Sequence, residues 1–240
     1  MPPDLSIERA LRRRGFDRIA GVDEAGRGAW AGPVVAAVVL LPDRADLPYV
    51  DSKTVPAARR ERLAEHVRAT ATAWAVAEAD VAEVDALGPL RATHLAVHRA
   101  IAGLAVAPDA FVTDYLRLRF ATLPQPEVLA PAHADGLSLS VAAASLLAKT
   151  HRDARMCAAA VDWPAYGFER HKGYGVPSHR AALQRSGPCP WHRRSVRPVA
   201  EIAAKVRAYD PARVQDAARV QDAARVQDAA RGLAAEEGSP

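Results

Sequence analysis

The sequence predicts an α/β domain with a mixed central sheet, and two observations support this prediction. First, two apolar runs rich in β-branched residues, 18–23 and 34–39, flank a glycine-rich turn. This is the pattern of two buried strands. Second, further strand patterns at 72–79, 110–116 and 127–132 alternate with helical patterns. Strands that come first, with helices interleaved later, are typical of a mixed sheet covered by helices.

The helices are predicted from apolar spacing and from the residues at their ends. Pro56 stands where a helix would begin, with Leu63 and Val67 on its inner face. A second helix is predicted from one apolar stripe that contains Leu90, Val97, Ile101 and Leu104. The third helix covers Ser140 to Ala160 and is rich in small residues. We therefore expect at least three helices against the sheet.

Composition divides the chain into three segments. Residues 1–17 are polar and rich in arginine, which predicts a short helix or arm ahead of the main domain, 18–205. The tail, 206–240, contains the sequence Arg-Val-Gln-Asp-Ala-Ala three times in succession, from Arg213 to Ala230. A period of six does not match the helical repeat of 3.6, so the valines form no seam. We expect a solvated or partly disordered helix in the tail.

Composition also limits the class of protein. The 240 residues carry a net charge of +4 and a pI of about 9.3, which suits a polyanionic partner without identifying one. Two cysteines, Cys157 and Cys189, exclude a disulfide framework and a four-cysteine zinc site. There is no signal-peptide pattern, and the apolar run 29–41 is too short to cross a bilayer. We expect a cytoplasmic monomer without a membrane segment.

The hexapeptide Asp-Glu-Ala-Gly-Arg-Gly, which begins at Asp23, is the densest chemical signal. Neighbours on a strand point to opposite faces. Asp23 and Glu24 can therefore serve one site only if a divalent cation draws them together or one acts through its backbone carbonyl. The turn of Gly26, Arg27 and Gly28 lets the backbone approach a ligand, and Arg27 suits a phosphate. The alternative is an acidic, glycine-rich β-turn without a function.

Two further acids extend this signal. Asp114 interrupts an apolar strand, where a lone acid usually has a reason. Asp135 precedes the small-residue helix, where it could equally be a loop or N-cap residue. Four carboxylates could hold two hard cations, an arrangement that activates water and stabilises the leaving oxygen in phosphodiester cleavage.

Positive side chains follow the acids along the chain. Ser145, Lys149 and Asp153 are spaced by four residues, hence on one helical face. Lys149 could extend its positive charge toward a phosphate, or it could simply form a surface ion pair with Asp153. Lys172 and Tyr174 lie in a glycine-flanked segment, where cations could hold phosphates while the tyrosine stacks on a sugar or base. The alternative for Tyr174 is packing on its own loop.

The order of these motifs resembles the ribonuclease HII family, the type 2 ribonucleases H. The resemblance covers roughly residues 18–200. The matching segments are Gly-Val-Asp-Glu-Ala-Gly-Arg-Gly, Asp51-Ser52-Lys53, the strand aspartate, Ala-Ala-Ala-Ser-Leu-Leu-Ala-Lys with Arg152-Asp153, His171-Lys172-Gly173-Tyr174-Gly175 and His192-Arg193-Arg194-Ser195.

The resemblance implies a ribonuclease H-like fold, in which a mixed five-stranded sheet is flanked by helices and followed by a helical C-terminal part. It implies a catalytic site for Mg²⁺ or Mn²⁺ made by four acids, Asp23, Glu24, Asp114 and Asp135. It also implies that the glycine turn and a tyrosine sense a ribonucleotide's 2′-hydroxyl and that a lysine contacts phosphate. We therefore expect substrate contacts from Gly26, Arg27, Gly28, Lys53, Ser145, Lys149, Lys172 and Tyr174.

The implied activity is endonucleolytic and metal-dependent. It comprises hydrolysis of the RNA strand in RNA–DNA hybrids and cutting on the 5′ side of single ribonucleotides in duplex DNA. The products are 3′-hydroxyl and 5′-phosphate ends, and the implied role is ribonucleotide removal from DNA. The related type 3 enzymes carry an extra N-terminal domain, for which the short leader here has no room, so type 2 is favoured.

Three residues depart from the family pattern. Tyr115 follows the strand aspartate where a glycine is usual and could crowd the site, His133 replaces a lysine near Asp135, and Val196 replaces a common phenylalanine. Two alternatives therefore stay open. One is another nuclease of the same broad fold, which would cleave all-DNA substrates. The other is a binding protein whose metal site has decayed.

Overall fold

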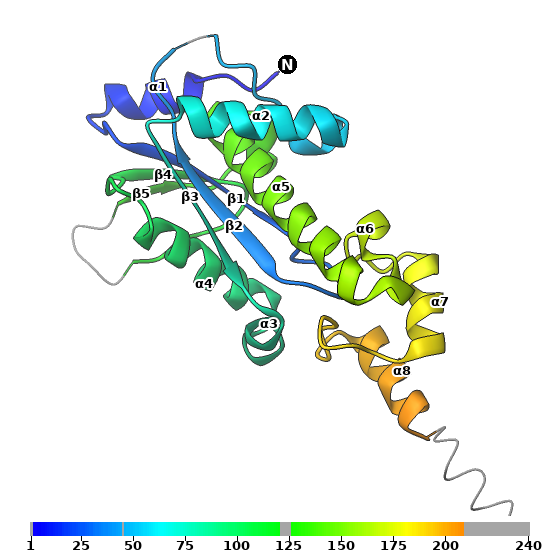
Figure 1. The fold of residues 1–240 in the computed structure, drawn as a ribbon. Helices are drawn as coiled ribbons and strands as arrows, with labels where there is room; N and C mark the ends of the chain where they lie inside the picture. The colour runs from blue at the N-terminus through cyan, green and yellow to red at the C-terminus, as the bar shows by residue number, and fades with distance from the viewer. Residues whose placement is uncertain (1, 45, 121–125, 209–240) are drawn as a thin grey trace, which may run out of the picture.

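A five-stranded sheet forms the centre of the computed structural model, with the strand order β3-β2-β1-β4-β5 (Figure 1). The structure describes residues 2–44, 46–120 and 126–208. The strands are β1 (Ile19–Ala25), β2 (Val34–Leu40), β3 (Ala73–Ala79), β4 (Ala110–Thr113) and β5 (Glu127–Leu129). The pairs β1–β2 and β2–β3 are antiparallel, and β1–β4 and β4–β5 are parallel. The predicted mixed sheet is confirmed.

Helices cover both faces of the sheet (Figure 1). On one face lie α2 (Ala57–Thr70) and α5 (Leu139–Asp162), and on the other α3 (Val81–Leu87) and α4 (Pro89–Ala102). Side chains alternate along a strand, so β2 supplies Val35, Ala37 and Val39 to the first core and Val34, Ala36, Val38 and Leu40 to the second. A strand buried on both faces explains the near-continuous apolar run in the sequence.

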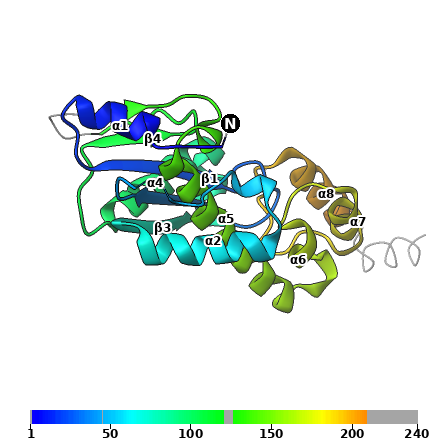
Figure 2. The same ribbon diagram turned by 90° about the horizontal axis from the view of Figure 1, so that it is seen from above.

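The C-terminal helices form a third core beyond one end of the sheet (Figure 2). These helices are α6 (Phe168–His171), α7 (Pro177–Ser186) and α8 (Arg197–Ala208). Helix α5 continues from the sheet into this part, where Met156 and Ala159 join its core. At the other end of the chain, α1 (Ser6–Arg13) has a buried Glu8 that accepts hydrogen bonds from Ser138 and Ser140.

Several sequence expectations need correction. On α4 the buried residues are small ones, Ala92, Thr93, Ala96, Val97 and Ala100, whereas Leu90 is 54% exposed and Leu104 follows the helix. Small side chains let α4 pack closely on the alanines and valines of β2. The strands β4 and β5 end earlier than expected, at Thr113 and Leu129. The repeats from Arg213 to Ala230 lie outside the described residues. No helix in the described part is both long and apolar enough to cross a membrane.

Candidate active site

The carboxyl ends of β1 and β4 bring two of the predicted acids to one edge of the sheet. The two strands run parallel, and their last paired residues are Val22 and Thr113. Asp23 and Asp114 follow these residues directly, so the two acids lie level with each other, Asp23 still within β1 and paired with β2, and Asp114 just beyond β4. A pocket of about 370 Å³ lies at this edge, and it is lined by Asp23, Glu24, Ala25, Gly26, Arg27, Gly28, Ser52, Lys53, Asp114, Ser145, Lys149 and Tyr174.

Asp23 is the most buried acid that lines this pocket, with 6% of its surface exposed. It accepts a hydrogen bond from the Glu24 backbone N–H at 2.8 Å and another from Ser145. Burial and then the charge of Glu24 raise the pKa of Asp23 to about 8. Burial is also the main cause that raises the pKa of Glu24. The two carboxylates therefore lack enough positive charge to balance them.

Positive groups partly neutralise the other acids. Lys53 Nζ donates to Asp135 Oδ2 at 2.8 Å, and Arg27 Nη1 lies 3.1 Å from Glu24 Oε1. Asp135 is 4% exposed and does not line the pocket. Its link to the pocket is the ion pair with Lys53, which does line it. Lys53 itself has 70% of its side chain exposed and can move. Thus three predicted acids line the pocket and the fourth lies behind a lysine.

The donor set suits a hard cation, because Mg²⁺ and Mn²⁺ prefer carboxylate oxygens. Within the described residues, no three histidine, cysteine or acidic side chains are close enough together to form a ready-made metal centre. In this structure Asp135 pairs with Lys53 and Glu24 pairs with Arg27. Asp23, with its unbalanced burial, has the strongest need for a cation. The residues therefore fit a divalent cation that displaces these ion pairs.

Seven of the eight predicted substrate residues line the pocket, and Lys172 does not. The Lys172 ammonium donates to the Glu169 carbonyl, and its backbone is left-handed, with φ of 52°. The Lys172 side chain turns back onto α6, the helix that precedes it, and its place in a glycine-flanked loop gave no sign of this contact. Ser52, which was not predicted as a site residue, is buried in the lining and lies 2.8 Å from Ser145, oxygen to oxygen. Its only signal was its place in Asp51-Ser52-Lys53.

The three departures from the family pattern leave the pocket open. Tyr115 is 77% exposed, has a left-handed φ of 56° and does not line the pocket, so the expectation that it could crowd the site is wrong. His133 is exposed, and Lys53 supplies the cation at Asp135 instead. Val196 packs partly buried against the C-terminal core.

A chain of hydrogen bonds supports Tyr174 from behind. The Cys189 N–H donates to His192 Nδ1 at 3.0 Å, so the other nitrogen of His192 carries the hydrogen. This nitrogen donates to His179 Nε2 at 3.0 Å, which leaves His179 Nδ1 to donate to the Tyr174 carbonyl at 2.9 Å. Both histidines are therefore neutral, and each has one defined tautomer. Burial lowers the pKa of both histidines to about 4.

This histidine pair predicts a loss of stability in acid. An unfolded histidine has a pKa of about 6.5, so between pH 6.5 and 4 the unfolded chain binds more protons than the folded one. The pair's contribution to the free energy of unfolding should be fully present above about pH 6.5. Below this pH the free energy of unfolding should fall, by up to about 1.4 kcal/mol per pH unit for each histidine. Urea unfolding from pH 4 to 7.5 measures this. His192→Gln should flatten the profile, whereas exposed His133→Gln should not.

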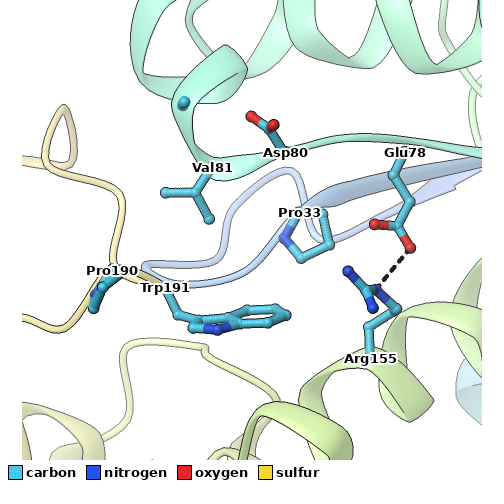
Figure 3. A pocket seen from close by; sticks show the side chains of 8 residues that line it. Pro33, Glu78, Asp80, Val81, Arg155, Pro190 and Trp191 are labelled. Atoms are coloured by element: carbon cyan, nitrogen blue, oxygen red, sulfur yellow. Dashed lines mark ion pairs between the residues drawn. The ribbon is translucent and has the colours of Figure 1, made fainter.

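A second pocket, of about 260 Å³, has different chemistry (Figure 3). It is lined by Pro33, Glu78, Asp80, Val81, Ala82, Arg155, Pro190 and Trp191. Glu78 is paired with Arg155 at 3.0 Å and with His151 at 2.6 Å, and the Arg155 guanidinium lies over the Trp191 ring. This pocket has fewer carboxylates than the pocket at β1 and β4, and one of them, Glu78, is already paired with positive side chains. The pocket at the ends of β1 and β4 is therefore the better candidate for catalysis.

Comparisons with known proteins show the family and the fold of the chain. A model of the ribonuclease HII family matches residues 20–199. A ribonuclease HII of Thermus thermophilus is 51% identical over 196 residues, 81% of this chain and 93% of the relative. One of Bordetella pertussis is 48% identical over 192 residues, 78% and 92% of the two chains. The crystal structure of the ribonuclease H2 from Pyrococcus horikoshii OT3 has the same fold, with a TM-score of 0.69, 23% identity and coverage of 80% and 99%.

Proposed function

Because this chain belongs to the ribonuclease HII family, and is therefore an endoribonuclease H for RNA–DNA hybrids, we propose that it also cuts beside single ribonucleotides in duplex DNA. The cut falls on the 5′ side and leaves 3′-hydroxyl and 5′-phosphate ends, which serves the removal of ribonucleotides from DNA. The observation that carries this proposal is one pocket shared by Asp23, the glycine turn and Tyr174. Chemistry and recognition would then act on the same nucleotide.

We propose that Asp23, Glu24, Asp114 and Asp135 hold Mg²⁺ or Mn²⁺. When bound, these cations supply Lewis acidity, which activates water and stabilises the leaving oxygen. Asp23 is the central ligand, since its burial beside Glu24 disfavours the ionised carboxylate and a bound cation would offset this cost. Asp135 is free to act once Lys53 leaves it, and the exposed Lys53 side chain allows that movement.

The remaining pocket residues bind and orient the substrate. Lys53 and Arg27 are charged, and their side chains are 70% and 47% exposed. Each can therefore exchange its carboxylate partner for a backbone phosphate. Lys149 is held by Asp153 at 2.6 Å, which keeps its ammonium in a fixed place near the pocket. Tyr174 is 37% exposed and can stack on the sugar or base of the ribonucleotide.

The cellular setting that we propose is the cytoplasm. Cys157 and Cys189 are both free thiols, one exposed and one buried, and free thiols agree with a reducing compartment. The substrates, RNA–DNA hybrid and ribonucleotide-containing duplex DNA, are polyanions that suit the chain's positive net charge.

The decisive test uses a labelled DNA duplex that contains one ribonucleotide, with Mg²⁺ and Mn²⁺ tested separately and an all-DNA duplex as the control. We expect one cut on the 5′ side of the ribonucleotide and none in the control. Cutting of the control would favour a DNA nuclease of the same fold. Binding without any cut, under either metal, would favour a protein with a decayed site.

Tyr174→Ala should slow cutting at a single ribonucleotide by about tenfold or more. Stacking of an aromatic ring contributes about 1–3 kcal/mol, and about 1.4 kcal/mol corresponds to tenfold. Single-turnover rates on the one-ribonucleotide duplex measure the loss. Tyr115→Ala is the matched control, because Tyr115 is exposed and outside the pocket, and it should cut at the wild-type rate. Equal rates for the two variants would remove Tyr174 from recognition.

A further inference from the structure

Two arginines are fully buried without an acid to pair with. Arg152 and Arg193 have 0% and 1% of their surfaces exposed, and neither takes part in an ion pair of the described residues. Both guanidinium groups donate to backbone carbonyls instead. A buried charge without an opposite charge is costly, so a fold that keeps two of them side by side has a use for their geometry.

Arg152, on α5, joins two segments that are far apart in the sequence. One is the glycine-turn segment, 26–33, and the other is the tyrosine loop, 172–175. Arg152 donates to the carbonyls of Pro33 at 3.0 Å and Ala31 at 2.9 Å in the first segment and of Lys172 at 2.9 Å in the second. The planar guanidinium spreads its fixed donors over three nitrogens, whereas a lysine ammonium carries its three donors on a single atom.

The same side chain touches the parts of each segment that face the substrate. A Cβ on Gly26 would lie 1.9 Å from Arg152 Nε, so the guanidinium occupies the space directly behind this glycine. The Arg152 Cζ atom is 5.3 Å from the centre of the Tyr174 ring, within the range of a cation–π contact. Arg152 therefore contacts both the turn and the tyrosine that line the pocket.

Backbone contacts bring the two segments together, but they do not reach the tyrosine ring. The N–H groups of Trp30 and Ala31 donate to the Gly173 carbonyl at 2.9 and 3.2 Å. Gly173 has a φ of 80°, and a Cβ there would lie 2.5 Å from the Ala31 oxygen. The backbones are thus in direct contact, and the Arg152 side chain adds a contact with both Gly26 and the Tyr174 ring.

We propose that Arg152 is a positioning residue that sets specificity for a single ribonucleotide. It holds Tyr174 at a fixed place relative to the glycine turn, so that both can meet one 2′-hydroxyl. This inference rests on the proposed function of Tyr174 and the turn. An RNA–DNA hybrid presents a 2′-hydroxyl at every position and tolerates a displaced tyrosine, whereas a duplex with one ribonucleotide offers a single alignment.

Arg193 provides a matched control. It is equally buried and donates to the carbonyls of Gly32 at 2.8 Å and of Arg27, Ala29 and Pro33 at 3.0 Å. All of these belong to the glycine-turn segment. The Arg193 charge lies near enough to Tyr174 to interact with it electrostatically, but no described hydrogen bond or ring contact joins Arg193 to the tyrosine loop. A merely structural role would make Arg152→Lys and Arg193→Lys behave alike.

The first experiment compares cutting of the one-ribonucleotide duplex with cutting of a hybrid, at a temperature where circular dichroism shows each variant folded. Arg152→Lys should lower the ratio of the two rates by about tenfold, and Arg193→Lys should change both rates together. Arg152→Lys should add no further loss of ratio to Tyr174→Ala. An unchanged ratio, or fully additive losses, would overturn the inference. Arg152→Gln, which keeps donors without the charge, repeats the test if the lysine variant does not fold.

The second experiment does not depend on activity. Amide hydrogen exchange in the tyrosine loop should become faster in Arg152→Lys and stay near wild type in Arg193→Lys. Wild-type exchange at 172–175 in Arg152→Lys would overturn the inference even if the enzyme were slower. A normal rate for Tyr174→Ala would instead contradict the proposed function, so the two failures can be told apart.

Discussion

Asp23→Asn should abolish cleavage while duplex binding stays close to wild type. The substitution keeps the shape of the side chain and removes the charge that, in the proposed function, holds a divalent cation near the end of β1. Cations of this kind contribute several kcal/mol to phosphodiester cleavage, so the rate should fall by about a thousandfold or more. Single-turnover cleavage measures the rate, and fluorescence anisotropy without divalent cations measures binding.

The same variant should fold at least as well as the wild type without added metal, because a buried carboxylate beside Glu24 is unfavourable there. Asp43→Asn is the matched control, since Asp43 lies at the surface, where it forms an exposed ion pair with Arg9 and a longer contact with the partly buried Arg12. It should cleave normally. Substantial cleavage by Asp23→Asn with either Mg²⁺ or Mn²⁺ would refute the assignment of Asp23 as the central ligand.

Gly21→Ala should be among the most destabilising single substitutions in the chain. The strand β1 packs so closely on α5 that a Cβ at this position would lie 2.1 Å from the Ser140 carbonyl carbon and 2.4 Å from the Val141 nitrogen. These are backbone atoms at the start of a helix, so they cannot rotate away, and β1 and α5 must separate. Overpacking of this kind costs about 3 kcal/mol or more, which equilibrium unfolding in urea measures.

Gly103→Ala separates this clash from the general effect of replacing a glycine. At Gly103, which follows α4, a Cβ would meet its nearest atom, the Ala100 oxygen, at an ordinary 3.5 Å, and φ is −82°. Its stability should change by about 0.5 kcal/mol at most. If Gly21→Ala destabilised the protein as little as Gly103→Ala, the close packing of β1 on α5 described above would be wrong.

Local patterns in the sequence predicted most of the sheet and much of the site. Apolar runs identified β1 and β2, and the acids at the end of β1 follow directly from chain order. The parallel pairing of β1 with β4 then brings Asp114 level with Asp23, as an acid on a buried strand suggested. The five strand patterns in the sequence correspond to the five strands of the sheet, and the family resemblance implies the same number.

The expectations that failed concern where individual side chains point and what they contact. Leu90 satisfies the helical stripe, yet the surface of β2 selects small residues on α4. The ammonium of Lys172 bonds to a carbonyl three residues back, which charge alone does not reveal. Nothing in the sequence marks Arg152 as buried, because its three carbonyl partners lie about 20 and 120 positions away along the chain. Only the folded chain brings them together.

Helix α5 has a consequence for how such an enzyme can diverge. Its 24 residues extend about 36 Å. Ser145 and Lys149 lie beside the acids in the pocket, Arg152 follows in contact with the Tyr174 ring, and Met156 lies in the C-terminal core. The sheet carries the acids proposed for hydrolysis, while the C-terminal part carries Tyr174. Substitutions among α6, α7 and α8 could therefore change which nucleotide is chosen without altering the bond-breaking groups. Substrate preference could then evolve independently of hydrolysis, with α5 as the structural link between the two parts.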